Sequence, residues 1–480
     1  MKKLDIVILT CILAIALGLR LYKINTPLAD AHSWRQADTA AVARNFVRNG
    51  FDLMKPTYDD LTSIETGIEN PKGYRMVEFP IYNAIFAAMY RYLPIVSLEV
   101  YGRLTSALFS LVTIAVLYYL ALKEHSRAAA IGTAITFATM PYFVFFSRVI
   151  LPETTAVACM MLSILFLYFV TQFKNSTAKS LTYFFLSVLF YAMALLIKPT
   201  VVFYSISIAY LFISTYKFQL LKEWKAYVFV ILGVIPFVLW RMYISNYPEG
   251  IPDSSWLFTN VNTFEGSKNI FFKPAFFRWV FYERLGKMML GIYLSFLMLL
   301  GITGKFKKYF LHSIFASAIV YLFTFQGGNV QHTYYQTVIF PGIALMVGLG
   351  IGQLVSATNQ AFSKTLAYPT LVLVFVFSFA FSYYEIKDFY NTPPDLPPIA
   401  KLIGAFTKPT DLIVTDRLGD TTLLYLADRK GSPAVYRSIE ELKNMGYSYL
   451  VTANKETTEK LKTEGKEILV ESNQFAIIKL

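Results

Sequence analysis

The sequence predicts an α-helical protein that crosses a membrane many times and ends in a small α/β domain. Of its 480 residues, 55% are hydrophobic and only 16% are charged, and the mean hydropathy is +0.48. A soluble chain of this length carries more charge and cannot bury so much apolar surface. Long apolar runs alternate with short polar gaps over most of the chain. Composition and pattern together therefore exclude an ordinary soluble protein.

The first apolar run covers about residues 6–21 and follows Lys2 and Lys3. It resembles a signal peptide, but no small-residue cleavage site follows it, so we expect an uncleaved first span with a cytoplasmic N-terminus. Further runs of near-spanning length bring the expected total to about eleven membrane helices. They lie at roughly 100–122, 128–146, 153–173, 180–197, 200–216, 225–244, 286–303, 309–326, 335–356 and 366–385.

Basic residues mark every second gap between these runs. They are Lys123 and Arg127, Lys174 and Lys179, Lys217, Lys222 and Lys225, Lys305, Lys307 and Lys308, and Lys364. Cytoplasmic loops of membrane proteins carry such an excess of Lys and Arg. The net charge of +13 is therefore an orientation signal and not a sign of nucleic-acid binding. With an odd number of spans, the C-terminal segment lies outside the cytoplasm.

The expected organisation has two domains. A membrane domain covers residues 1–390 and includes a first extracytoplasmic loop at 23–99. Two parts of this loop, 38–47 and 78–92, have helical spacing and are expected to lie along the membrane as interfacial helices. Strand and helix signals alternate in residues 391–480, which predicts a small soluble α/β domain outside the cytoplasm.

A polar stretch directly after the first span is the main candidate for a functional site. Asp30, His32, Trp34, Arg35 and Asp38 fall within nine positions. Together they offer a base, a cation and an aromatic wall beside a bilayer surface. Two other interpretations stay open: each charge alone is an ordinary solvated loop residue, and Asp38 opens a helix as an N-terminal cap.

Two cations on the opposite face from the basic gaps break the orientation pattern. Arg148 lies between Phe145-Phe146-Ser147 and Val149-Ile150-Leu151, and Lys198 closes an apolar helix just before Pro199. Long cationic side chains can reach from helix ends to the interface, which is one interpretation. The other is that both cations, with Arg35, face a cavity and hold an anion such as a phosphate.

Further acidic and aromatic residues lie on the same face. Glu78 and Glu153 are candidates to orient an acceptor or a sugar, or to bind a cation; Glu153 also suits the start of a helix because it follows Pro152. Four polar rings are either site lining or interface anchors: His32, His332, Tyr334 and Tyr335.

No cofactor motif stands out. The His and Cys spacing fits no zinc site, and neither a phosphate-binding loop nor a dinucleotide fingerprint occurs. Cys11 and Cys159 lie inside apolar runs, so we expect no disulfide and no Cys-ligated metal. No cofactor is required on this interpretation, although a divalent cation is left open.

The order of these motifs resembles the GT-C superfamily, polytopic glycosyltransferases that use polyprenyl-phosphate sugars. The resemblance is strongest to protein O-mannosyltransferases and lipid A aminoarabinose transferases, and it covers most of the first 350 residues. The motifs are Asp30 after the first span, Ala-Arg-Asn at 43–45, Glu78-Phe-Pro, the 147–153 segment, Lys198-Pro and a Tyr-Tyr…Phe-Pro pattern ending at Pro341.

The resemblance implies an inverting sugar transfer from a lipid such as undecaprenyl phosphate to an acceptor hydroxyl at the outer face of the plasma membrane. It places the catalytic base at Asp30. The sequence departs from the family where Ala31 follows Asp30 and where Phe79 replaces a lysine, so Asp38 is the second candidate for the base. The implied donor phosphate ligands are Arg35, Arg148, Lys198, His332 and Tyr335, and the acceptor or sugar ligands are Glu78, Glu153, His32 and Trp34.

We expect these distant residues to converge on one pocket at the non-cytoplasmic side. The expected partners are a polyprenyl-phosphate-linked sugar, membrane lipids, and a glycan, lipid or protein acceptor. Two rival functions are a lipid-linked sugar flippase and an assembly factor whose C-terminal domain binds a partner. A flippase predicts inverted repeats and charges at the membrane midplane, and we find neither in the sequence.

Overall fold

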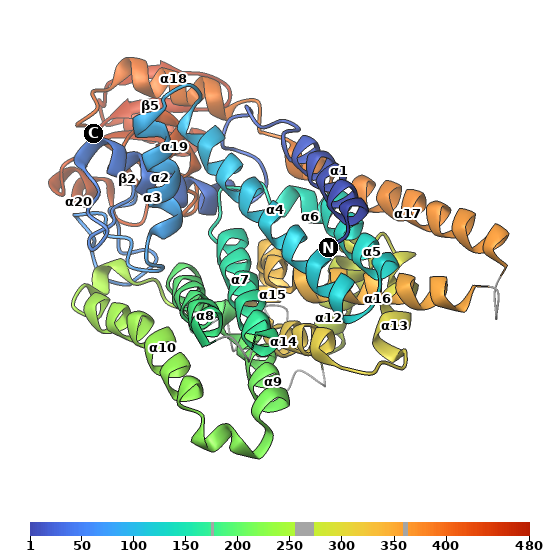
Figure 1. Cartoon of the computed structure of the whole chain (residues 1–480). Helices are drawn as coiled ribbons and strands as arrows, with labels where there is room; N and C mark the ends of the chain where they lie inside the picture. The colour runs from blue at the N-terminus through green and yellow to red at the C-terminus, as the bar shows by residue number, and fades with distance from the viewer. Residues whose placement is uncertain (174–176, 255–272, 359–362) are drawn as a thin grey trace. The chain divides into compact units, whose positions relative to one another are not determined.

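The computed structural model describes residues 1–173, 177–254, 273–358 and 363–480 (Figure 1). Its contacts divide the chain into two compact units. The first, which we call the helical unit, comprises Met1–Ile24, Arg103–Trp240 and Ser254–Asp388. The second, the mixed unit, comprises Asn25–Gly102, Arg241–Asp253 and Phe389–Leu480. The first loop thus groups with the C-terminal segment by contacts, while the predicted membrane boundary near residue 390 stays a prediction.

Helices of very different length build the helical unit. They are α1 (Lys3–Arg20), most of α4 (Leu98–Glu124), α5 (Arg127–Thr139), α6 (Pro141–Phe146), α7 (Glu153–Gln172), α8 (Thr177–Ile197), η1 (Pro199–Tyr204), α9 (Ser205–Tyr216), η2 (Lys217–Lys222), most of α10 (Trp224–Ile244), α12 (Pro274–Phe277), the π-helical η5 (Arg278–Met289), α13 (Leu294–Thr303), α14 (Phe310–Thr324), α15 (Gln326–Gln331), η6 (Thr333–Ile339), α16 (Phe340–Ala357) and α17 (Lys364–Ile386).

The protein is a multi-pass membrane protein, and its helices confirm this part of the prediction. Within the described residues, seven helices are long and apolar enough to cross a membrane. An eighth span results if the pair Pro274–Met289 and Leu294–Thr303, which is bent by 116°, crosses as one. The count of about eleven spans stays a prediction, because α14 is a shorter apolar helix and the predicted run 128–146 is divided between α5 and α6.

The spanning helices differ in how much of their surface other helices cover. The apolar window of Thr333–Ala357 is 83% buried, whereas those of α10 and α17 are 22% and 17% buried. Gly348 and Gly350 let α16 approach α5 and α13 closely, because a Cβ there would lie 2.0 Å from Thr133 Oγ1 and 1.9 Å from Leu297 O. Small residues are the usual means of close packing between membrane helices. The exposed apolar side chains of α10 and α17 have lipid as their natural solvent.

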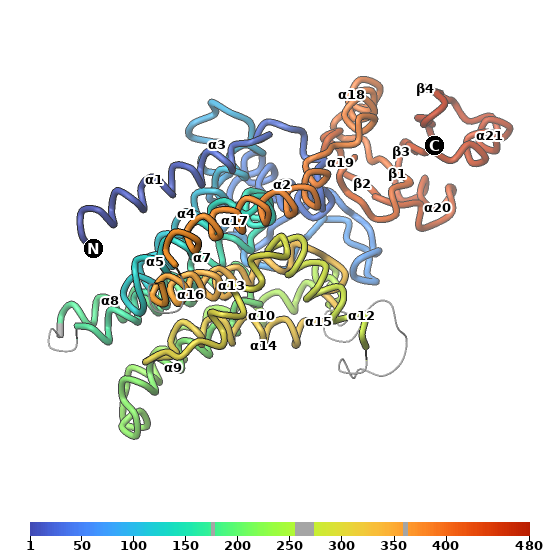
Figure 2. Tube along the Cα trace, turned by 90° about the vertical axis from the view of Figure 1, so that its right-hand side faces the viewer, coloured from blue at the N-terminus to red at the C-terminus, as the bar shows by residue number. Residues whose placement is uncertain are grey.

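The mixed unit confirms the predicted small C-terminal α/β fold. Its sheet has the order β2-β1-β3-β5-β4, in which β1 is parallel to β2 and β3, and β5 is antiparallel to β3 and β4. Figure 2 shows β1, β2, β3 and β4 near the C-terminus, with α20 and α21 beside them. Its elements are α2 (Ser33–Asn49), α3 (Ile81–Tyr92), α18 (Leu396–Phe406), β1 (Leu412–Thr415), α19 (Thr422–Ala427), β2 (Gly431–Ser432), α20 (Ile439–Asn444), β3 (Tyr447–Thr452), α21 (Lys455–Thr463), β4 (Ile468–Glu471) and β5 (Ala476–Lys479).

The first loop adds a short segment to this sheet. Asp60 forms a parallel bridge with Gly431 at the free edge of β2. The amide of Leu61 donates to Gly431 O, and the amide of Gly431 donates to Asp59 O, each at 2.9 Å. A sheet edge carries unpaired backbone groups that a neighbouring strand can satisfy. Residues far apart in the sequence therefore form one folded unit, in which α2 lies against the C-terminal segment.

Candidate active site

Asp30 is buried at the entrance to α2. Its side chain is 2% exposed, and its Oδ1 accepts a hydrogen bond from Gln36 Nε2 at 2.7 Å. His32 has the left-handed φ of 57°, and the helix begins at the next residue, so the chain turns sharply between Asp30 and Gln36. Burial of a carboxylate is costly unless hydrogen bonds compensate for it. Asp30 is therefore not an ordinary solvated loop residue.

Arg35 and Glu78 form an ion pair between α2 and the turn that precedes α3. Arg35 Nη2 donates to both carboxylate oxygens of Glu78, at 2.8 and 3.0 Å. The two side chains are 8% and 13% exposed. The sequence suggested separate roles for them, a phosphate ligand and a sugar ligand. In the structure the two side chains pair with each other, and their separate roles stay predictions.

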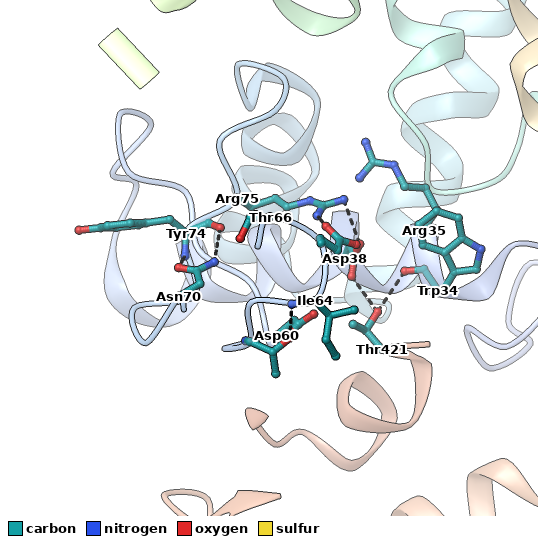
Figure 3. A network of polar contacts seen from close by, with 12 residues as sticks. Trp34, Arg35, Asp38, Asp60, Ile64, Thr66, Asn70, Tyr74, Arg75 and Thr421 are labelled. Atoms are coloured by element: carbon teal, nitrogen blue, oxygen red, sulfur yellow. Dashed lines mark hydrogen bonds and ion pairs between the residues drawn. The ribbon is translucent and has the colours of Figure 1, made fainter. Parts of the chain in front are cut away.

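Asp38 sits at the centre of a buried network (Figure 3). Its Oδ1 accepts a hydrogen bond from Thr421 Oγ1 at 2.7 Å, and its Oδ2 lies 3.1 Å from Arg75 Nη2. Arg75 also pairs with Glu65. Burial raises the pKa of Asp38 to about 7, although the charges of Arg75 and Arg35 and the Thr421 hydrogen bond act in the opposite direction.

The interpretation of Asp38 as a helix cap is wrong. The helix begins at Ser33, five residues earlier than the cap prediction requires, and its N-cap residue is His32. Asp38 instead lies in the second turn and is 1% exposed. The half-buried Trp34 lies one turn before it, and its carbonyl oxygen accepts a hydrogen bond from Thr421 Oγ1 at 3.2 Å.

A second group of the predicted residues meets in the helical unit. Glu153 is the first residue of α7, and its Oε1 lies 2.9 Å from Lys198 Nζ, between α8 and η1. The two side chains are 2% and 10% exposed. Lys198 Nζ also lies 5.9 Å from the centroid of the Tyr335 ring in η6. Three elements that are far apart in sequence therefore place an acid, a cation and a tyrosine together.

Arg148 is fully buried, with 0% exposure. Its Nη1 donates to Lys23 O at 3.3 Å, and its guanidinium lies 5.6 Å from the centroid of the Phe145 ring. A side chain that reaches for the interface keeps its charged head in water. The interface interpretation is therefore wrong for Arg148, and the burial of Lys198 excludes it there too.

His332 stacks with two tyrosines at the start of η6. The ring centroids of His332 lie 5.5 Å from Tyr334 and 6.1 Å from Tyr335, and those of the two tyrosines lie 4.7 Å apart. Burial, aided by the charge of Arg284, lowers the pKa of His332 to about 4. The imidazole is therefore neutral near pH 7 and can contribute hydrogen bonds but no positive charge.

Arg284 is a cation that the sequence analysis missed. It lies in η5, is 6% exposed, and donates from Nη2 to Val330 O. Among the described residues its Nη1 has no hydrogen-bond partner. A buried guanidinium with an unsatisfied donor is a strong candidate for an anion ligand. The sequence signal was an arginine on the non-cytoplasmic side, immediately before the apolar run at 286–303.

The predicted site residues thus form several buried groups. Asp30, Arg35, Asp38 and Glu78 belong to the mixed unit, with His32 and Trp34; Arg148, Glu153, Lys198, His332 and Tyr335 belong to the helical unit. Convergence of both sets on one pocket stays a prediction. Over the described ranges, no three His, Cys, Asp or Glu side chains are grouped so that they could hold a metal ion. Cys11 and Cys159 are both free thiols.

The fold defines a class: a polytopic membrane protein with a second unit that contains a small sheet. Residues 80–240 match the family model described as dolichyl-phosphate-mannose-protein mannosyltransferase. No curated protein sequence matches the chain.

Solved structures resemble the chain much more extensively. ArnT from Cupriavidus metallidurans, bound to undecaprenyl phosphate, matches with a TM-score of 0.65 and 14% identity over 98% of this chain and 97% of its own. AglB from Archaeoglobus fulgidus, in complex with an inhibitory peptide and a dolichol-phosphate, matches with a TM-score of 0.59 and 11% identity, covering 94% and 69%. The arabinofuranosyltransferase AftD from Mycobacteria matches with 0.55 and 14%, covering 93% and 36%.

The chain therefore has a fold of the GT-C type, which these solved structures share. This confirms the fold that the motif resemblance implied, and the match of residues 80–240 to the mannosyltransferase family model agrees with it.

Proposed function

We propose that the chain is a membrane glycosyltransferase that moves a sugar from a polyprenyl phosphate to an acceptor hydroxyl, with inversion at the sugar. The observation that carries the proposal is the buried Asp30 carboxylate at the start of α2, in a chain that shares its fold over 98% of its length with ArnT bound to undecaprenyl phosphate. The acceptor is a hydroxyl of a glycan, a lipid or a protein.

Asp30 is the better candidate for the general base. A base needs a lone pair directed at the hydroxyl that it deprotonates. Both oxygens of Asp38 are engaged, one by Thr421 and one by Arg75. Asp30 accepts a hydrogen bond from the neutral amide of Gln36, and it is the acid directly after the first apolar run, where the family resemblance places the base. We therefore assign the base to Asp30 and a supporting role to Asp38.

The reaction needs positive charge where the lipid phosphate departs. Asp30 takes the proton of the acceptor hydroxyl, the hydroxyl oxygen attacks the anomeric carbon, and the bond from that carbon to the phosphate oxygen breaks. The electron pair stays with the lipid phosphate, whose added charge fixed cations stabilise. In this proposal Lys198, Arg148 and Arg284 bind that phosphate, with Arg35 contributing from α2. Arg284 offers an unsatisfied donor among the described residues.

The two glutamates then hold cations in place. Glu78 accepts from Arg35, and Glu153 pairs with Lys198. Each acid lowers the net charge of its neighbourhood and fixes the geometry of its cation, as bidentate and buried pairs do. Trp34 and His32, which flank the start of α2, supply the surface for the acceptor or the sugar. The neutral His332 and Tyr335 line the phosphate end of the site.

The proposed location is the plasma membrane, with the N-terminus in the cytoplasm and the C-terminal segment outside. The regular alternation of basic gaps supports this orientation. The site then works at the outer face, where the polyprenyl tail enters from the bilayer. The proposal requires that Asp30 and the phosphate-binding cations act on the same donor molecule.

The test is to incubate purified protein in lipid nanodiscs with a panel of polyprenyl-phosphate sugars and to measure release of the lipid phosphate. We expect release with one donor, dependent on an acceptor, and its loss in Asp30→Asn. Asp52→Asn is the matched control because Asp52 is an exposed loop residue of the same unit. Normal turnover by Asp30→Asn removes Asp30 as the base. Movement of intact donor across the membrane without release of lipid phosphate supports the flippase.

A further inference from the structure

The C-terminal segment contacts α2 along its whole length. Going along α2, Ser33 Oγ accepts from Thr422 Oγ1 at 2.9 Å, and Asp38 accepts from Thr421. Further on, Arg44 Nη1 donates to Tyr425 O at 2.8 Å. Later residues of α2 thus meet later residues of the α19 segment, so the two helices run in the same direction side by side.

The far end of this contact is ionic and anchors α19. Arg48 forms two hydrogen bonds with Asp428, at 2.7 and 2.6 Å. Arg44 stacks on the Tyr425 ring at 4.4 Å and pairs with Asp59 and Asp428. Charged groups with several partners hold their geometry better than isolated pairs. None of these contacts involves Thr421.

The near end of the contact lies beside the proposed site. The single hydroxyl of Thr421 reaches Asp38 Oδ1 at 2.7 Å and Trp34 O at 3.2 Å (Figure 3). It therefore bridges two successive turns of the helix that carries Trp34, Arg35 and Asp38. Asp38 in turn holds Arg75 on its other oxygen. Thr421 is only 3% exposed, so bulk water has little access to the position of its hydroxyl.

We infer that Thr421 is a positioning residue for the proposed transfer. Because its hydroxyl contacts the first two turns of α2, the C-terminal segment contributes to the site. The inference rests on the proposed function, since it concerns how Trp34 and Arg35 are presented to the substrates. A hydrogen bond from a neutral donor to a buried carboxylate is among the stronger ones, so its loss moves the helix start.

The charge of Asp38 gives this inference a second, separate readout. The charged groups that act on Asp38 are Arg75 and Arg35, which favour its ionised form, and Glu65 and Asp60, whose negative charges oppose it. The Thr421 hydrogen bond also favours the ionised form. Removing the hydroxyl therefore raises the pKa of Asp38 further, and Arg75 loses its partner at a higher pH.

The test compares Thr421→Val, which keeps the shape, with Thr421→Ser, which keeps the hydroxyl. Thr463→Val is the matched control, because the Thr463 hydroxyl is exposed and bonds only within its own helix to Glu459 O among the described residues. We expect Thr421→Val to lower kcat by about tenfold to a hundredfold, as small misplacements of substrate ligands do. In Thr421→Val, the pH at which activity falls on the acidic side of the pH–rate profile should rise by about one unit. Thr421→Ser and Thr463→Val should behave like the wild type.

A measurement without turnover separates this inference from the proposed function. The fluorescence of Trp34, taken as the difference between the wild type and Trp34→Phe, is titrated with pH in nanodiscs. We expect a transition that shifts upward in Thr421→Val and disappears in Asp38→Asn. An unchanged transition and unchanged kcat in Thr421→Val overturn the inference. So does detachment of the C-terminal segment in that variant, seen as new sites of limited proteolysis, because the role would then be purely structural.

Discussion

The buried pair of Glu153 and Lys198 allows structural and functional roles to be separated by one set of variants. Lys198→Met removes the cation but keeps most of the volume, and it leaves the 2% exposed Glu153 side chain without this partner 2.9 Å away. Breaking a buried pair from one side typically costs about 3–5 kcal/mol, because an uncompensated charge stays behind. We expect that loss in the free energy of unfolding of Lys198→Met.

The double variant Glu153→Gln with Lys198→Met removes both charges. Replacing a buried pair by neutral groups of similar size is often close to neutral for stability. We therefore expect the double variant to recover most of the lost stability but none of the lost affinity for lipid phosphate. Unfolding is followed by thermal or denaturant titration in nanodiscs, and binding by titration with undecaprenyl phosphate.

An exposed pair supplies the control for this cycle. Lys462→Met disrupts the 3.0 Å pair with Glu471, in which the two side chains are 51% and 42% exposed. Exposed pairs contribute about 0–1 kcal/mol, so this variant should differ little from the wild type in stability and binding. The reasoning is refuted if the double variant binds lipid phosphate normally, because Lys198 then serves only to balance Glu153. A stable Lys198→Met variant would equally refute the assigned burial cost.

Four further predictions follow from individual groups. Arg148→Ala should weaken donor use by at least about tenfold. Arg127→Ala should leave donor use unchanged, because Arg127 pairs with Asp5 and its side chain is partly exposed. Equal effects of the two changes contradict the assignment of Arg148 to the phosphate. Arg284→Met should reduce binding of undecaprenyl phosphate with little change in stability, because removal of the buried unsatisfied Nη1 offsets the lost hydrogen bond to Val330 O; normal binding excludes it as a ligand. Burial raises the pKa of Asp38 in the folded protein to about 7, above its value in the unfolded chain. Proton uptake by Asp38 therefore stabilises the folded state fully below the unfolded pKa, and this stabilisation is lost as the pH rises through 7. Asp38→Asn should therefore flatten the fall in stability between about pH 4 and 7, measured by thermal unfolding. A reporter fused after Leu480 should read as extracytoplasmic, and a cytoplasmic signal overturns the orientation.

The fold class was accessible from the sequence because its signals are local. Apolar runs, basic gaps and alternating strand and helix signals each depend on a short stretch of chain. The limits of this approach appear where a boundary depends on contacts. The start of α2 is one example: Asp38 suits a helix cap, yet the left-handed His32 and the packing of Ser33 start the helix earlier. The bent pair of η5 and α13 likewise reads as a single apolar run.

The candidate site was accessible as a set of residues but not as a set of partners. Charges next to apolar runs singled out Asp30, Arg148 and Lys198, because such positions are costly unless they serve a purpose. Nothing local links Arg35 to Glu78, 43 positions away, or Asp38 to Thr421, 383 positions away. Such pairs form only when distant segments fold against each other.

The proposed function requires Asp30, Lys198 and Arg284 to act on the same donor molecule. The most direct measurement uses an undecaprenyl-phosphate analogue with a photoreactive group beside the phosphate, cross-linked to the wild-type protein in nanodiscs and mapped by peptide mass spectrometry. The account predicts labelled peptides from the first turns of α2, around Asp30 and Arg35, and from the segments around Lys198 or Arg284. Labelling confined to one of these two sets of peptides would contradict the account. So would labelling that persists unchanged in Lys198→Met, in Arg284→Met and in the presence of excess unlabelled lipid phosphate.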